Sequence, residues 1–424
     1  MQPLFLTNLN PASLRPDEHV NRDREAQWLK SGLTAFLRAQ SPLSGDAFCV
    51  LGDKGMGKSL LTRKVFDDLR RTHAATVLLL EVDCRPLRNQ RHVYREIGRR
   101  LVDELGYRTS VPSALKAAAR SFGQLARFET LSLSEAHEQL IGNKIELGLE
   151  SGEMRLFGWL RTRLNIGLER SSQVIRSLQG KVQVDGPQLQ EALFALLHDI
   201  VTQTELRVVV HLDNLEELNH EAMLDESTRE LVRADVEALL HLSEAPMALV
   251  LTMRTYYSSV LTRRIQRRQT LRPLGVEDHL EIFRRRAAME PTDIQRALED
   301  PSLDAGLSRL AAEARTPLAF LEWTRYLLEE GRLDEEEPLE VLRARLDSHY
   351  AQIAPFIPKV ASLFDSLEEV VPFEAIHRAC DGRDVTVRQL QELQVILPRN
   401  YWDPQDFLLD PQLGFLLASA FTSS

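Results

Sequence analysis

A glycine-rich motif near the N-terminus constrains this chain more than any other feature of its sequence. The motif follows the pattern G-x-x-x-x-G-K-S and consists of Gly52, Asp53, Lys54, Gly55, Met56, Gly57, Lys58 and Ser59. A short apolar run at 47–51 precedes it, and a helical pattern with Leu61, Val65 and Leu69 follows it. This order of strand, glycine loop and helix start is the setting in which such a motif binds phosphate. The alternative, a glycine turn before an unrelated helix, is disfavoured by the same flanking pattern.

The residue types of the motif predict how a nucleotide would bind. Glycine lets backbone N–H groups turn inward around a phosphate chain, and the start of the following helix adds partial positive charge at the same point. We expect Lys58 to reach the β- and γ-phosphates of ATP and the Ser59 hydroxyl to ligate Mg²⁺. The eight loop residues and the adjacent Leu60 are therefore candidate nucleotide-binding residues.

Composition and length favour a soluble protein of several domains. The chain has 424 residues, enough for two or three domains, and its charged fraction of 27% is ordinary for a globular protein. No apolar run approaches the ~20 residues of a membrane helix, and the first residues do not resemble a secretory signal. The three cysteines, Cys49, Cys84 and Cys380, form neither a disulfide framework nor a metal motif, which predicts a cytoplasmic protein. The eleven histidines show no metal-ligand spacing.

The net charge of −10 argues against a protein that binds nucleic acid over its whole surface. A local basic patch is still present in the segment 263–286. It contains Arg263, Arg264, Arg267, Arg268, Arg272, Arg284, Arg285 and Arg286. DNA binding through this segment therefore stays open.

The hydrophobic pattern from residue 21 to residue 275 predicts an α/β core. Continuous apolar runs, typical of fully buried strands, occur at 76–82, 206–212 and 247–253. Amphipathic helical patterns occur between them, at 21–40, 93–105, 189–200 and 228–242. Buried strands that alternate with helices indicate a parallel sheet with helices on both faces. Residues 1–20 contain three prolines and are expected to form an extended arm.

The segment 106–187 departs from this alternation. A helical pattern at 113–125 is followed by period-two alternation at 145–150 and 164–169, which indicates two half-exposed strands that could form an antiparallel pair. We interpret the segment as an insertion with a helix and a β-hairpin. It could equally be an arm that orders only on a partner.

Asp213 is the strongest candidate for a second metal ligand, because it directly follows the buried run 206–212. Enzymes with a phosphate loop hold Mg²⁺ with an aspartate at the end of such a strand. The alternative is that Asp213 caps the next helix, and the two roles can coexist.

These motifs, in this order, resemble the AAA+ and STAND branch of P-loop ATPases, and most of all the origin-recognition-type initiators. The resemblance covers most of residues 20–335. The matching segments are an arginine–acid box at 21–25, Walker A at 52–59, Walker B at 208–214, a sensor-1 strand at 249–254, an arginine-finger helix at 261–268 with the last strand at 271–274, a first lid helix at 277–286, and a lid motif at 315–319.

The resemblance implies roles for further residues. Thr252 would face the γ-phosphate, and Pro317 would lie in the lid motif that touches adenine. Arg267 or Arg268 would act on the nucleotide of a neighbouring subunit, which implies a homo-oligomer. The alternative is a solvated basic helix. The lid is expected at 276–335.

Two departures from the family pattern favour a slow switch over a fast motor. The position after Asp213, usually glutamate, is Asn214, and Glu216 and Glu217 lie close by in the sequence. Hydrolysis could therefore be slow, or it could depend on a partner. The lid motif has Leu318 where an arginine is usual, and Arg315, three residues away, is the candidate substitute.

Residues 336–424 resemble the winged helix that ends both kinds of relative. Helices are expected at 353–367, 373–380 and 386–393, followed by a two-stranded wing at 395–398 and 407–410. The third helix contains Arg388 as its single arginine, so a clamp on the core or a protein-binding surface competes with DNA binding.

The sequence therefore predicts an ATP-dependent switch that assembles with a partner protein or with DNA. Its candidate catalytic residues are Lys58, Asp213, Glu216, Thr252, Arg267 and Arg268. A non-hydrolysing nucleotide-dependent scaffold is the main alternative, and a small-molecule kinase is a third, which the C-terminal pattern disfavours.

Overall fold

The structure is a computed structural model, and it describes most of the chain. The described residues are 21–39, 43, 45–127, 186–218, 226–261, 265–333, 338–349, 351, 353–366, 369–400, 402–410 and 413. The predicted N-terminal arm at 1–20 and the predicted strands at 145–150 and 164–169 lie outside them. Within the described residues, no helix is long and apolar enough to cross a membrane.

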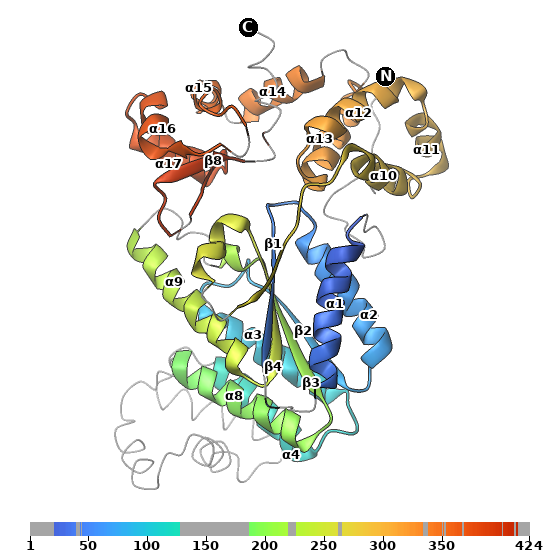
Figure 1. The fold of residues 1–424 in the computed structure, drawn as a ribbon, viewed down its shortest axis with the longest axis vertical. Coiled ribbons are helices and arrows are strands. Elements are labelled where there is room, and N and C mark those ends of the chain that lie inside the picture. The colour runs from blue at the N-terminus through green and yellow to red at the C-terminus, as the bar shows by residue number, and fades with distance from the viewer. Residues whose placement is uncertain are drawn as a thin grey trace, which may run out of the picture.

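A five-stranded parallel sheet forms the centre of the N-terminal half (Figure 1). Its strands follow the order β2-β3-β4-β1-β5. They are β1 (Asp46–Leu51), β2 (Val77–Asp83), β3 (Arg207–Asp213), β4 (Met247–Met253) and β5 (Arg267–Thr270). The continuous apolar runs are explained by burial, since β3 and β4 are covered on both faces.

Helices cover both faces of this sheet, as the sequence predicted. On one face lie α1 (Asp23–Arg38) and α2 (Lys58–His73); on the other lie α3 (Gln90–Gly106), α4 (Ser113–Arg127), α8 (Gly186–Gln203) and α9 (Glu226–Leu240) (Figure 1). Two separate apolar clusters fill the two faces, because alternate residues of each strand point to opposite sides. Phe48 and Val50 of β1 pack toward α1 and α2, whereas Cys49 and Leu51 pack in the other cluster.

The strand order places the glycine loop at a change of direction in the sheet. After β1 the chain crosses to β2 at the far edge, and β3 and β4 then fill the space between them. In open parallel sheets, ligands bind beyond the carboxyl ends of the strands at such a point. The loop follows β1 directly and therefore lies there.

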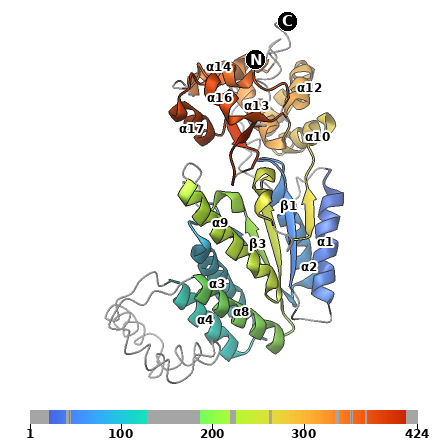
Figure 2. The ribbon, with the colours of Figure 1, turned by 60° about the vertical axis from the view of Figure 1, so that its left-hand side comes forward.

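The helices of the lid follow β5. They are α10 (Val276–Ala287), α11 (Thr292–Leu298), α12 (Asp304–Glu313) and α13 (Pro317–Glu329), with a short 3₁₀ turn, η6 (Pro301–Leu303), before α12. Figures 1 and 2 show them, together with the C-terminal region, beyond the end of the sheet at which β5 leaves it.

The C-terminal region combines short helices with a small antiparallel sheet. The helices are α14 (Pro338–His349), α15 (Ile357–Ala361), α16 (Phe373–Ala379) and α17 (Asp384–Glu392). The sheet has the order β6-β8-β7 and consists of β6 (Val371–Pro372), β7 (Ile396–Pro398) and β8 (Asp406–Leu409). The expected pairing of the last two strands is confirmed. One apolar cluster runs from Leu280 of the lid to Leu409 of β8, so the lid and this region share a core.

Three predictions about local structure are wrong. The helix expected at 353–367 is reduced to the five residues of α15. Pro358 lies in its first turn, and because proline has no backbone N–H to donate to a preceding turn, the helix does not extend toward residue 353. Arg267 and Arg268 lie on β5 and not on a helix, so the last strand begins earlier than expected. Arg286 is buried and cannot belong to an exposed basic patch.

Candidate nucleotide-binding site

The glycine loop adopts the backbone conformation that its glycines predicted. Gly55 has a φ of 81° and Gly57 a φ of 87°, both in the left-handed region that favours glycine. A Cβ atom on Gly55 would lie 2.3 Å from Leu318 Cβ and 3.0 Å from Thr316 Oγ1. The loop therefore requires glycine here for two reasons, its backbone conformation and the close approach of the lid. Lys58 begins α2 immediately after Gly57.

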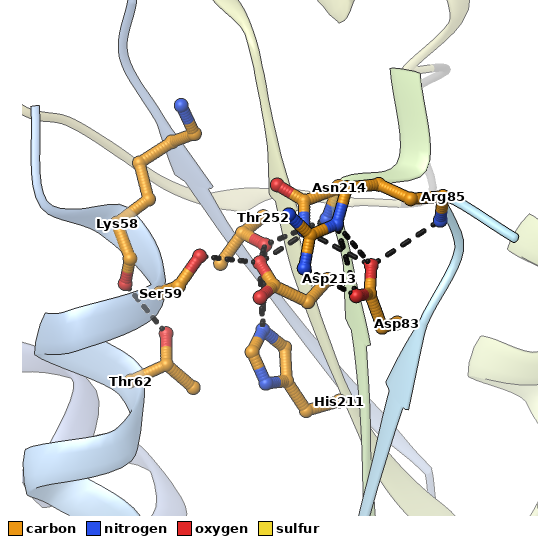
Figure 3. A network of polar contacts seen from close by, with 9 residues as sticks. All are labelled: Lys58, Ser59, Thr62, Asp83, Arg85, His211, Asp213, Asn214 and Thr252. Atoms are coloured by element: carbon orange, nitrogen blue, oxygen red, sulfur yellow. Dashed lines mark hydrogen bonds and ion pairs between the residues drawn. The ribbon is translucent and has the colours of Figure 1, made fainter. Parts of the chain in front are cut away.

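Ser59 and Asp213 meet beside the loop, although 154 residues separate them in the sequence. Ser59 lies in the first turn of α2, and Asp213 is the last residue of β3. The Ser59 hydroxyl donates a hydrogen bond of 2.7 Å to Asp213 Oδ1 (Figure 3). A hydroxyl and a carboxylate are the hard oxygen ligands that Mg²⁺ prefers, and Mg²⁺ commonly takes its other ligands from phosphate and water. The two side chains thus fit the metal role predicted for them.

Asp213 accepts hydrogen bonds from three donors, of which the Ser59 hydroxyl is one. Thr252, near the end of β4, donates its hydroxyl to Asp213 Oδ1, and the backbone N–H of Asn214 donates to the same oxygen over 3.1 Å (Figure 3). The buried His211 places Nε2 3.3 Å from the Thr252 hydroxyl. Burial lowers the pKa of His211, which favours a neutral ring, while Asp213 opposes this effect. Asp213 therefore has a fixed orientation toward α2.

Lys58 is buried, and its amine points back to the loop. Its Nζ donates to the carbonyl oxygens of Gly52 over 2.8 Å and of Asp53 over 3.0 Å. Burial lowers the pKa of Lys58, and the nearby Glu216 carboxylate partly offsets this. These two carbonyls hold the amine beside the loop where a phosphate chain would lie.

Glu216 is buried against an arginine that the sequence did not single out. It lies on the 3₁₀ turn η2 (Leu215–Glu217), and one carboxylate oxygen is 3.3 Å from Nε of Arg254. Arg254 also binds Glu217 and donates to the Tyr256 hydroxyl over 3.2 Å. Burial raises the pKa of Glu216, and its Oε2 has no hydrogen-bond partner among the described residues. The structure thus brings this predicted catalytic residue close to Lys58 but pairs it with a buried cation.

The lid and the start of α1 close the other side of the loop. Thr316 caps α13 by accepting a hydrogen bond from Ala319 N, and Pro317 occupies the first position of that helix. On the α1 side, Arg22 Nη2 donates to Met56 O over 3.4 Å. The predicted lid motif and arginine–acid box therefore both reach the loop.

Arg267 and Arg268 do not join this cluster. Arg267 is 3.0 Å from an Asp46 carboxylate oxygen and lies over the Phe48 ring, at the start of β1, whereas the loop follows the end of β1. Arg268 donates to backbone carbonyl oxygens of Leu261 and Ile265. Any role on a neighbouring subunit stays a prediction.

The sequence interpretation also missed Asp83. Asp83 ends β2 as Asp213 ends β3, and its Oδ1 accepts a hydrogen bond of 3.1 Å from Asn214 Nδ2. Burial opposes ionisation, but hydrogen bonds from Arg85 and Asn214 hold the pKa of Asp83 below its ordinary value. The sequence pattern that identified Asp213, an aspartate directly after an apolar run, is also present at Asp83 and could have identified it.

Comparison with known proteins finds a family that is similar to the segment containing the loop. The model of the AAA domain family matches residues 44–181. No curated protein matches the sequence. Among solved structures, the Aeropyrum pernix ORC2 protein in its ADP form is 12% identical with a TM-score of 0.47, covering 98% of this chain and 97% of that one. The Aeropyrum pernix ORC1 protein in complex with DNA is 14% identical with a TM-score of 0.44, covering 98% and 97%. Drosophila ORC bound to DNA is 15% identical with a TM-score of 0.38, covering 99% and 94%.

The family match can be compared with the geometry of the loop. The matched residues carry the whole phosphate loop. The parallel sheet, the left-handed glycines and the pairing of Ser59 with Asp213 agree with it. Residues 44–181 of this chain are therefore similar to the AAA domain family in both sequence and loop geometry.

Proposed function

We propose that this chain is an ATP-binding and slowly hydrolysing molecular switch, which couples its nucleotide state to assembly with a partner protein or with DNA. The observation that carries the proposal is the hydrogen bond between Ser59 and Asp213 beside the glycine loop. It brings the two expected oxygen ligands of Mg²⁺ together at the point where the loop would hold the phosphates. Nothing in the packing of the sheet alone demands a hydroxyl and a carboxylate there.

ATP is held by residues 52–60 in this proposal. The amine of Lys58, now bonded to the carbonyls of Gly52 and Asp53, would bind phosphate oxygens, and Ser59 and Asp213 would hold Mg²⁺. The metal supplies positive charge that neutralises the developing charge on the phosphoryl group. Thr252, already bonded to Asp213, is placed to respond when a γ-phosphate arrives.

Slow hydrolysis follows from the residues around the attacking water. Asn214 has an amide at the position where the ATPases that this chain resembles usually have a carboxylate. Glu216 is paired with the buried Arg254. An amide cannot accept a proton from water at neutral pH, and removing a carboxylate from a buried ion pair is costly.

Contacts between η5 and the C-terminal region support a route by which that region would respond to the site. Directly after β4 and Thr252, the 3₁₀ segment η5 (Thr255–Val260) contacts the connection between β7 and β8. The Tyr257 and Trp402 rings lie 4.8 Å apart, and Ser259 Oγ donates to Asn400 Oδ1 over 2.6 Å. We propose that the region is a winged-helix clamp on the core, and that a shift of β4 changes its docking.

Partner binding is the less determined part of the proposal. Assembly with a second copy would use Arg267, whose side chain is half-exposed. DNA contact would use Arg388 on α17 together with the neighbouring arginines, but the thin positive charge favours a protein partner.

A non-hydrolysing scaffold is the second candidate. The specific observation that favours it is the same pairing of Glu216 with Arg254. The two candidates differ in one measurable quantity, the release of phosphate from bound ATP over many turnovers.

The test of the proposal is ATP binding by the full chain. The variant Lys58→Ala should weaken ATP binding by at least about 100-fold, because it removes a charge-assisted contact to phosphate that few other side chains near the loop could replace. Lys64→Ala is the matched control: Lys64 lies on the same helix, but its amine is half-exposed and pairs with Asp23. Equal ATP affinity of the parent and Lys58→Ala would contradict the proposed site.

A further inference from the structure

Two carboxylates end neighbouring strands beside the glycine loop. In the parallel pair of β2 and β3, Asp83 lies directly opposite Asp213. Neighbouring strands are about 4.8 Å apart, so both side chains stand at the same edge of the sheet. Figure 3 shows them on adjacent strands, with Asn214 between them and Ser59 on the far side of Asp213. Asp213 is engaged by Ser59 and Thr252, whereas Asp83 has no part in the function proposed above.

Asn214 connects the two carboxylates. Its backbone is left-handed, with a φ of 55°, and its N–H bonds to Asp213. Its side-chain amide donates to Asp83 Oδ1 over 3.1 Å. The residue after Asp213 therefore cannot accept a proton itself, but it fixes the position of a neighbouring residue that can.

Arg85 holds Asp83 from the solvent side. Its Nε lies 3.0 and 2.9 Å from the two carboxylate oxygens, and its Nη2 lies 2.6 Å from Oδ2. The Arg85 side chain is 62% exposed and that of Asp83 is 41% exposed. An ion pair at the surface is weak, and an arriving phosphate would compete for the guanidinium. Glu216 differs in this respect, because both it and Arg254 are buried.

On the basis of the proposed ATP hydrolysis, we propose that Asp83 is the catalytic carboxylate that orients the attacking water, and that Arg85 restrains it until nucleotide binds. The water oxygen forms a bond to the γ-phosphorus while the bond from that phosphorus to the β–γ bridging oxygen breaks. The bonding electrons leave with ADP. Asp83 accepts one proton of the water and passes it to solvent, and the products are ADP and inorganic phosphate.

The test compares three variants of the full chain for turnover, ATP affinity and the nucleotide retained after a fixed incubation with ATP and Mg²⁺. Asp83→Asn should lower kcat by at least about 100-fold, the range of a lost general base, with ATP affinity within about threefold of the parent. The protein recovered should contain ATP in place of ADP. Arg85→Gln should raise kcat by up to about fivefold.

Glu81→Gln is the matched control. Glu81 lies two residues earlier on β2 and binds Arg70 over 2.5 Å, so this change also removes an arginine–carboxylate pair from the same strand. It should leave kcat and the retained nucleotide unchanged. If Asp83→Asn folds poorly, Asp83→Ser and Asp83→Glu replace it: the glutamate should retain turnover and the serine should lose it.

Each outcome separates this inference from the function on which it rests. A parent that binds no ATP refutes the nucleotide switch itself. A parent that binds and hydrolyses ATP, with Asp83→Asn within threefold of its kcat, overturns the role of Asp83 alone. A parent that binds ATP without turnover, and stays inactive after Arg85→Gln, overturns it as well.

Discussion

Replacing Thr252 by valine tests whether one buried hydroxyl organises the site. Valine keeps the branched shape of threonine and removes only the hydroxyl, which is the group that donates to Asp213 and lies 3.3 Å from His211 Nε2. A hydrogen bond to a charged group contributes about 1.5–3 kcal/mol, and a buried polar atom left without a partner costs about 1–3 kcal/mol. His211 is 1% exposed, and its Nδ1 already has no hydrogen-bond partner among the described residues. Because the two effects share one hydroxyl, we expect Thr252→Val to lower the free energy of unfolding by about 2–4 kcal/mol in total.

Thr252→Ser is the matched control, since serine keeps the hydroxyl and loses a methyl group. It should cost about 1 kcal/mol. Both free energies of unfolding would be measured by urea denaturation of the nucleotide-free protein, followed by circular dichroism. ATP binding should survive in Thr252→Val, because Ser59 and the Asn214 N–H still hold Asp213.

A valine variant no less stable than the serine variant would refute the reasoning. The network drawn in Figure 3 would then be a consequence of the strand ends meeting, and Thr252 would not determine the orientation of Asp213.

Three further changes test other parts of the structure. Burial raises the pKa of Asp235 to about 6, so its charged form destabilises the fold above that pH, and this penalty disappears toward pH 4. Asp235→Asn should therefore raise the free energy of unfolding by about 1 kcal/mol at pH 8, after allowing for partial exposure, and leave it unchanged at pH 4. Equal gains in urea denaturation at both pH values would contradict this. Gly55→Ala should weaken nucleotide binding at least about tenfold, because alanine is strained in the left-handed region and its Cβ would clash with Leu318. Gly106→Ala is the control: the space around its Cβ is open, so a nucleotide titration should give the affinity of the parent. Trp402→Ala should speed proteolysis between the core and the C-terminal region, because it removes the indole ring that packs against Tyr257. Tyr107→Ala is the control, since Tyr107 is 89% exposed and its loss should not change the cleavage rate. Equal cleavage rates for the two variants would argue against docking through Trp402.

The sequence predicted the sheet and the loop because both leave local signals. A continuous apolar run followed by an aspartate identified Asp213, and the motif identified Ser59, so their meeting was predictable from the fold class alone. The same signal after 76–82 pointed to Asp83, but no motif directed attention to it.

The errors arise where structure depends on distant partners. Arg267 and Arg268 have high helix propensity and lie directly between two glutamines, yet they form an edge strand because the β1 backbone offers hydrogen bonds. The ion pairs of Arg254 with Glu216 and Glu217 join segments 37 or more residues apart, and no period in the sequence encodes them.

The core that the lid shares with the C-terminal region determines how this molecule can move. A densely packed interior resists shear, so helices built around one interior rotate together. The lid helices and the described parts of the C-terminal region would then move as one lever, with the connection between β5 and α10 as its pivot. A slight tilt at the nucleotide would then produce a larger displacement in the parts of this lever that lie farthest from the pivot.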